Sequence, residues 1–218
     1  MQNSLSEAEL PEETSQSRRA VICNNAKKLH MDKILYNTIT TQIDNITKKF
    51  QSCCEIGCSF CCYQMIEVYD FEKEEIQNAI KNLTSEEKKQ IEINLGNWLD
   101  FFNENTPNNK ILDEFDTIKN LINISKTRSE KCPLLINNLC SIYEKRPITC
   151  RIHSVKNFPQ KCKEDPHRSS SPEANDLRAY TIQFISRFKR SELFFLPFIV
   201  AEEIKTDRKI KPLKKLFI

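Results

Sequence analysis

The chain of 218 residues is long enough for one ordinary domain with a core, and its 39% hydrophobic and 29% charged residues are typical of a globular protein. Its 33 basic and 30 acidic residues leave a net charge of +3, so we expect no nucleic-acid partner. The only glycines are Gly57 and Gly96. A sheet-rich fold with many tight turns needs more positive-φ positions than two glycines supply, so we expect a mostly α fold.

The N-terminal residues 1–20 are polar, acidic and without apolar periodicity, which predicts a disordered tail. They lack the basic start and apolar stretch of a targeting signal, and the longest apolar run, 193–200, is too short for a transmembrane segment. We therefore expect a cytoplasmic protein. Residues 21–205 are predicted to form a single helical domain, followed by a basic C-terminal tail over 206–218.

The first half of the chain shows apolar residues at helical spacing. This spacing predicts a helix over 26–51 and a second over 70–83, and Thr84 or Ser85 is a suitable cap for a third. A further helix is expected around 111–122. The predicted buried faces are Met31, Leu35, Ile39, Ile43, Ile46 and Phe50; Phe71, Ile76, Ala79, Ile80 and Leu83; Ile91, Leu95, Trp98 and Phe102; and Ile111, Phe115, Ile118 and Ile122.

The second half changes in character after Cys132. Two short extended pieces flank Asn137 and Asn138, which tolerate the left-handed conformation of a tight turn, so a small hairpin is predicted. Pro147 is expected to start a short helix. Residues 156–170 are polar and predicted to be a loop. Ser171 is a suitable cap for a helix ending near residue 190, and 194–204 is expected to pack in the core.

Four cysteines fall close together at 54, 58, 61 and 62. If this run is helical, 100° per residue places them at about 0°, 40°, −20° and 80°, on one face. Cys53 falls at about −100° and is therefore excluded, and both it and Cys23 are interpreted as small buried hydrophobes. Because Cys61 and Cys62 point in different directions on a helix, one tetrahedral ion would hardly accept both.

Four more thiols follow in loop or hairpin settings. The eight candidate metal ligands are Cys54, Cys58, Cys61, Cys62, Cys132, Cys140, Cys150 and Cys162. They could form two Cys₄ sites, or one site with spare redox-active thiols. A disulfide network is disfavoured in the cytoplasm, and buried hydrophobic cysteines do not usually cluster in a polar stretch. We therefore predict a helical domain with a small β-hairpin and a cysteine-rich metal site.

The ordered segments Cys54-x₃-Cys58-x₂-Cys61-Cys62, Cys132-Pro-Leu-Leu, Cys140-Ser-Ile-Tyr and Arg146-Pro-x-x-Cys150-Arg resemble the YkgJ-type cysteine-cluster family. The resemblance covers about residues 54–162 and implies chelation of zinc or iron, with an iron–sulfur cluster as an alternative. Flagellin lysine N-methylase has a similar cluster. By that resemblance, the alternative function is an iron-dependent or iron–sulfur enzyme that modifies a protein substrate, such as a protein lysine N-methyltransferase.

Other polar residues near the cysteines have two interpretations each. His153 could replace a thiolate, but with eight cysteines available we interpret it as a hydrogen-bonding neighbour of the site or a surface residue. Arg146 and Arg151 could offset thiolate charge or bind an anion, or could form ordinary ion pairs, for example with Glu144. The same thiols would also suit a redox sensor or a metal carrier. The sequence does not decide whether the chain is an enzyme.

Overall fold

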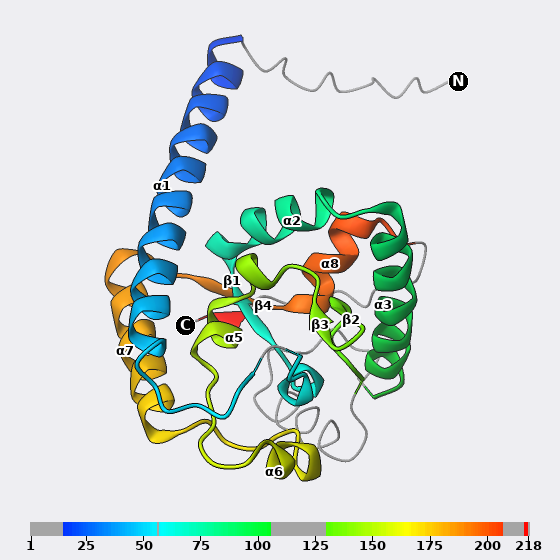
Figure 1. Cartoon of the computed structure of the whole chain (residues 1–218). Coiled ribbons are helices and arrows are strands. Elements are labelled where there is room, and N and C mark those ends of the chain that lie inside the picture. The colour runs from blue at the N-terminus through cyan, green and yellow to red at the C-terminus, as the bar shows by residue number, and fades with distance from the viewer. Residues whose placement is uncertain (1–14, 56, 106–129, 207–215, 218) are drawn as a thin grey trace, which may run out of the picture.

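The computed structural model describes residues 15–55, 57–105, 130–206 and 216–217, with side chains described from residue 26 to residue 206 within these ranges. The described chain is mostly helical, as predicted, with two small antiparallel sheets (Figure 1). Its elements, in chain order, are α1 (Ser15–Thr47), η1 (Phe60–Tyr63), β1 (Glu67–Tyr69), η2 (Asp70–Glu72), α2 (Lys73–Lys81), α3 (Ser85–Asn105), β2 (Leu135–Ile136), β3 (Leu139–Cys140), η3 (Tyr143–Lys145), α5 (Ile148–Ile152), α6 (Pro159–Glu164), α7 (Pro172–Phe188), β4 (Glu192–Phe195), α8 (Leu196–Ile204) and β5 (Leu216–Phe217).

Among the residues of α1 whose side chains are described, those that join the core lie in its C-terminal half, and the other end of the helix extends away from the domain (Figure 1). Ile39 and Ile43 of the predicted stripe are buried, whereas Met31 is 61% exposed. The helix begins at Ser15, within the segment predicted to be a disordered tail, and most of that tail lies outside the described residues. The stripe was thus predicted correctly only where α1 has neighbours to cover it.

A three-stranded sheet of order β1-β4-β5 divides the core into two parts. Val68 pairs with Phe194 and Tyr69 pairs with Leu193, in antiparallel register. Because successive strand residues face opposite sides, Val68 joins a cluster with α2, α3 and α8, and Tyr69 joins a cluster with α1, α5 and α7. Residues 194–195 of the predicted packing segment 194–204 belong to β4, and the remainder forms α8.

Helices α2 and α3 form as their apolar spacing predicts. Thr84 and Glu87 form a reciprocal capping box: the Glu87 N–H donates to Thr84 Oγ1 at 3.2 Å, and the Thr84 N–H donates to Glu87 Oε2 at 2.9 Å. The face predicted for α3 is fully confirmed, and Trp98 stacks on Phe102 with ring centroids 5.2 Å apart. The hairpin strand β2 packs against α3, and η3 packs against α2, so these two helices support the cysteine-bearing segments.

The second half of the chain agrees with prediction at three points and differs at one. Asn137 (φ 51°) and Asn138 (φ 63°) form the predicted hairpin turn between β2 and β3. Pro147 precedes α5, and Ser171 caps α7 by accepting from the Ala174 N–H at 3.3 Å. The predicted loop 156–170, in contrast, contains helix α6. A six-residue helix shows too little periodicity to be detected, although Pro159 is a favourable first residue.

Two expectations fall outside what the structure covers. The helix predicted around 111–122 lies outside the described residues, as does most of the basic C-terminal segment. Among the helices that are described, none combines the length and the apolar character that a membrane span requires.

Glu72 connects the centre of the fold to α5. Its side chain is completely buried, and its carboxylate accepts the Tyr69 N–H at 2.9 Å and the Ile148 N–H at 2.7 Å. Burial raises the pKa of Glu72 to about 7, although both of these N–H donors and Arg151 act in the opposite direction. One carboxylate therefore positions the start of α5, the helix that contains Cys150.

The buried carboxyl group of Glu72 predicts a pH-dependent stability. Its folded-state pKa lies above its unfolded value of 4.5, so its contribution to the free energy of unfolding is greatest below pH 4.5 and decreases as the pH rises through 7. This decrease amounts to about 3 kcal/mol at most. Glu72→Gln removes it, so the stability difference between wild type and variant should shrink from pH 5 to pH 8 in urea unfolding. A constant difference across that range would contradict the assignment.

Candidate metal centre

The segment that contains the first cysteines is a loop, so the assumption that residues 54–62 are helical does not hold. Residues 51–55 and 57–59 lack helical structure, and only η1, a short 3₁₀ helix, follows at Phe60–Tyr63. Gly57 has φ 88°, a left-handed conformation that interrupts a right-handed helix and that glycine adopts without strain. The common helical face, on which Cys53 was excluded, therefore does not exist.

Main-chain hydrogen bonds hold this loop against the downstream cysteines. The Cys132 N–H donates to the Cys62 carbonyl at 2.7 Å, which joins η1 directly to the segment before the hairpin. On the other side, the buried Asn94 of α3 donates through Nδ2 to the Pro133 carbonyl at 3.2 Å and the Leu135 carbonyl at 3.0 Å. The hairpin is thus fixed between the helical core and the cysteine loop.

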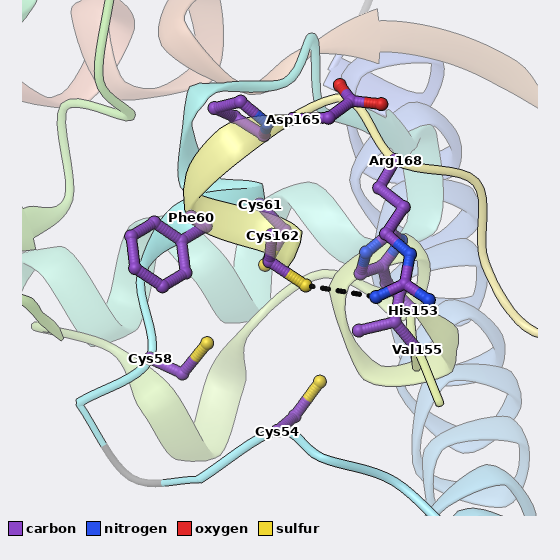
Figure 2. Close-up of a pocket in the computed structure, with 10 residues that line it drawn as sticks. Cys54, Cys58, Phe60, Cys61, His153, Val155, Cys162, Asp165 and Arg168 are labelled. Carbon is purple, nitrogen blue, oxygen red and sulfur yellow. Dashed lines mark hydrogen bonds between the residues drawn. The ribbon is translucent and has the colours of Figure 1, made fainter. Parts of the chain in front are cut away.

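An outer group of thiols surrounds a small cavity that is open to solvent. The sulfur atoms of Cys54, Cys58 and Cys162 face this space (Figure 2). Cys54 is exposed and Cys162 is buried, so the cavity extends from the surface inward. Its volume of about 10 Å³ matches a single ion or water rather than an organic cofactor.

A guanidinium group lies beside these thiols. Arg168 donates through Nη1 to Cys162 Sγ at 3.8 Å, as Figure 2 shows, and through Nη2 to the Lys156 carbonyl at 2.9 Å. A positive charge at this distance would offset the negative charge that develops as thiols deprotonate to bind a metal.

An inner group of thiols lies deeper, against the main core. Its members come from η1, the hairpin segment and α5, and they are Cys62, Cys132, Cys140 and Cys150. Burial raises the pKa of Cys132 to about 12, and burial followed by the nearby Cys132, Cys61 and Cys140 raises the pKa of Cys150 well above its usual value. These thiols therefore stay protonated unless a cation replaces the protons.

Cys61 lies between the two groups. A hydrogen bond with the neighbouring Cys62 thiol lowers the pKa of Cys61 and raises that of Cys62, so Cys61 is the thiol of this pair that loses its proton first. Cys61 is also a wall residue of the outer cavity. The expectation that these adjacent thiols point apart was derived for a helix and does not apply in η1.

The thiol of Cys53 lies beside Cys162. The Cys53 N–H donates to the Val155 carbonyl at 3.0 Å. Burial, then Cys54, then the hydrogen-bonded Cys162 thiol raise the pKa of Cys53. Cys53 is partly buried. The remaining excluded cysteine, Cys23, is in α1, and its side chain is not described.

The structure shows the partners of the three other polar residues for which the sequence left two interpretations each. His153 is half-buried beside the outer cavity, with Nδ1 2.9 Å from Ser170 Oγ, and burial followed by Arg178 lowers its pKa. Arg151 forms an ion pair, as one interpretation expected, but with Asp44 of α1 at 2.6 Å. Arg146 covers the exposed Tyr143 ring at 4.0 Å and lies close enough to Cys140 to lower its pKa against the effect of burial.

The donor set suits a soft or borderline metal, although the thiols are not arranged for binding as they stand. All nine cysteines whose side chains are described are free thiols. Within the described residues, no three His, Cys, Asp or Glu side chains are grouped closely enough to hold an ion. Thiolates are preferred ligands of zinc and of iron in iron–sulfur clusters, so the chemistry fits, and binding would require the side chains to turn inward.

A family model matches residues 52–171, more than half of the chain. The family is the CxxCxxCC family, described as a putative zinc- or iron-chelating domain. This chain belongs to the CxxCxxCC family. The match extends from the first cysteine loop through α6, so it includes both thiol groups of the CxxCxxCC domain. Searches of curated proteins and of solved structures gave no match.

Three residues that support the CxxCxxCC domain were not singled out from the sequence. Asn94 is a polar residue within a predicted amphipathic helix, Glu72 is one of many acidic residues near α2, and Arg168 lies in a polar stretch. None of them belongs to a recognisable motif. Asn94 offered the best signal, because it is a polar residue next to Leu95 on the side of α3 that faces the core.

Replacement of Asn94 should destabilise the hairpin. Asn94→Ala leaves the buried carbonyls of Pro133 and Leu135 without a donor, so we expect the free energy of unfolding to fall by about 2–3 kcal/mol. Asn97→Ala, at an exposed position of the same helix, is the matched control. Urea unfolding measures both. Equal effects of the two substitutions would show that the side-chain hydrogen bonds do not hold the hairpin.

Proposed function

We propose that the protein chelates zinc or iron through the eight motif cysteines, arranged as an outer and an inner site. The outer site includes Cys54, Cys58 and Cys162, and the inner site consists of Cys62, Cys132, Cys140 and Cys150. Cys61 lies at the boundary. When bound, the metal would supply a cross-link between segments that are distant in sequence.

The observation that carries this proposal is the convergence of thiols from four separate elements. Cys54 and Cys162 are 108 positions apart in sequence and line the same cavity. The pKa of Cys150, in α5, responds to Cys132 before the hairpin and to Cys140 within it. Free cysteines that act as separate buried hydrophobic residues do not usually gather in one region from distant segments. The protons of these thiols can be exchanged for a metal ion.

Metal analysis of the full-length protein tests the proposal. Eight thiolates with four per ion predict roughly two ions per chain after anaerobic purification. Cys150→Ser should lower that content and the Tm, because it removes an inner ligand and the cross-link that α5 makes. Cys23→Ser, outside the matched region, is the control. Protein with no bound metal and a Tm that chelator does not change would overturn the proposal.

Absorption spectroscopy of the same samples distinguishes the metals. Colourless protein with bound zinc indicates zinc chelation, whereas visible charge-transfer bands indicate iron or an iron–sulfur cluster. The protein lysine N-methyltransferase alternative stays a prediction of the sequence, because no feature of the described residues favours it over chelation alone.

The exposure of Cys54 favours a metal-carrier role as a second candidate function. Cys54 and the open cavity give a competing chelator access to an outer ion, whereas Cys132 is buried with the inner group. A site used for transfer must exchange its ion, while a structural site holds it.

The difference in exposure predicts two phases of metal release. With a chromophoric chelator in excess, we expect a fast phase from the outer site and a slower one, by about tenfold or more, from the inner site. Cys54→Ser should abolish the fast phase and leave the slow one. A single phase with both ions lost together would argue for one shared cluster and against transfer from the outer site.

A further inference from the structure

We propose that a second cavity beside the thiols, the Arg178 pocket, is a binding site for a small zwitterion of the α-amino acid type. Arg178 binds the carboxylate of this ligand, and Glu67 binds its ammonium group. The inference goes beyond the proposed chelation, because the two charged side chains are not among the metal ligands and recognition by them does not require a bound ion.

The Arg178 pocket is lined by residues from four elements. Its walls include Cys61 of η1, Glu67 of β1, Cys150 of α5 and Arg178 of α7. Its volume is about 80 Å³, against about 10 Å³ for the outer cavity. That is room for about five water molecules or for one organic molecule of similar size. A ligand in this space lies beside the boundary thiol and one thiol of the inner group.

The guanidinium group of Arg178 is incompletely paired. Its Nε is buried and makes no hydrogen bond within the described residues. By contrast, Arg151 donates to Asp44, and Arg168 donates to the Lys156 carbonyl. A buried charged donor without an acceptor is costly, and an anionic ligand removes that cost. A carboxylate is well suited, because the planar guanidinium group can bind both of its oxygens at once.

Glu67 provides the opposite charge in the same pocket. Burial raises the pKa of Glu67, and Arg178 acts in the opposite direction, so the two side chains are electrostatic neighbours. In the part of the chain that the structure describes, no direct ion pair joins them. Two opposite charges that line one cavity without pairing leave room for a ligand that carries both. An α-amino acid does so, because its carboxylate and ammonium groups are attached to the same carbon.

Two other polar side chains of the pocket already have partners within the protein. Gln64 donates through Nε2 to the Pro166 carbonyl at 2.8 Å, and Thr149 donates through Oγ1 to the Glu67 carbonyl at 2.7 Å. These bonds hold the pocket walls in place and are not available to a ligand. Recognition therefore depends on the carboxylate of Glu67 and the guanidinium group of Arg178.

Isothermal titration calorimetry of the full-length protein with glycine, acetate and methylammonium tests the proposal. Acetate and methylammonium each carry only one of the two charged groups. We expect one glycine per chain, bound at least about tenfold more tightly than either single-charge probe, because each of those leaves one charged side chain without a partner. Acetate that binds as tightly as glycine would overturn the proposal, as would the absence of glycine binding.

Variants of the two charged residues identify the site. Arg178→Met removes the charge at similar side-chain length and should weaken glycine binding at least about tenfold. Arg187→Met, at an exposed position of α7, is the matched control and should bind glycine like wild type. Equal glycine affinity in Arg178→Met and wild type would contradict the assignment.

Glu67→Gln separates recognition from a folding defect. It should weaken glycine binding but strengthen acetate binding, because it removes both the partner of the ammonium group and a charge that repels an anion. A variant that is merely misfolded would lose both ligands, and that outcome would count against the proposal. None of these measurements depends on the metal content, so their failure would leave the proposed chelation unaffected.

Discussion

The hydrogen bond from the Cys132 N–H to the Cys62 carbonyl is the contact on which the cysteine-rich region depends. At 2.7 Å, it joins two parts of the motif that are 70 positions apart in sequence. Neither part has a long helix or strand to position it: η1 is four residues long, and the hairpin strands have two residues each. Short elements like these have little stability alone, so the bond between them and their packing against α3 fix the thiols.

The rest of the fold supplies rigid supports for this contact. Asn94 holds the hairpin from the side of α3, and Glu72 positions the start of α5 by accepting the Ile148 N–H. Arg151, next to Cys150, ties α5 to α1 through Asp44. The polar supports are buried, so each has a high energetic cost if it loses its partner. A metal bound between the thiols would act on segments that the protein already holds close together.

The cysteines differ in depth, and that difference has chemical consequences. Three of the inner thiols, Cys62, Cys132 and Cys140, pack in or against the hydrophobic cluster of α3 and α8, where removal from water disfavours a free thiolate. The outer thiols lie around a cavity that is open to solvent, near a guanidinium group. Adjacent residues of an irregular loop thus face different surroundings, and under the proposed chelation they would provide one protected and one accessible metal position.

The sequence by itself determined the helical character, the hairpin turn at Asn137 and Asn138, the capped starts of α3 and α7, and the family. These features depend on local periodicity, on turn and cap residues, and on motif order, all of which are readable along the chain. The conformation around Gly57, the short helix at Cys162 and the grouping of the thiols were decided only by the tertiary structure. A helical assumption excluded Cys53, whereas in the loop its N–H donates to the Val155 carbonyl at 3.0 Å. Such contacts join residues about 100 positions apart, and no local pattern encodes them.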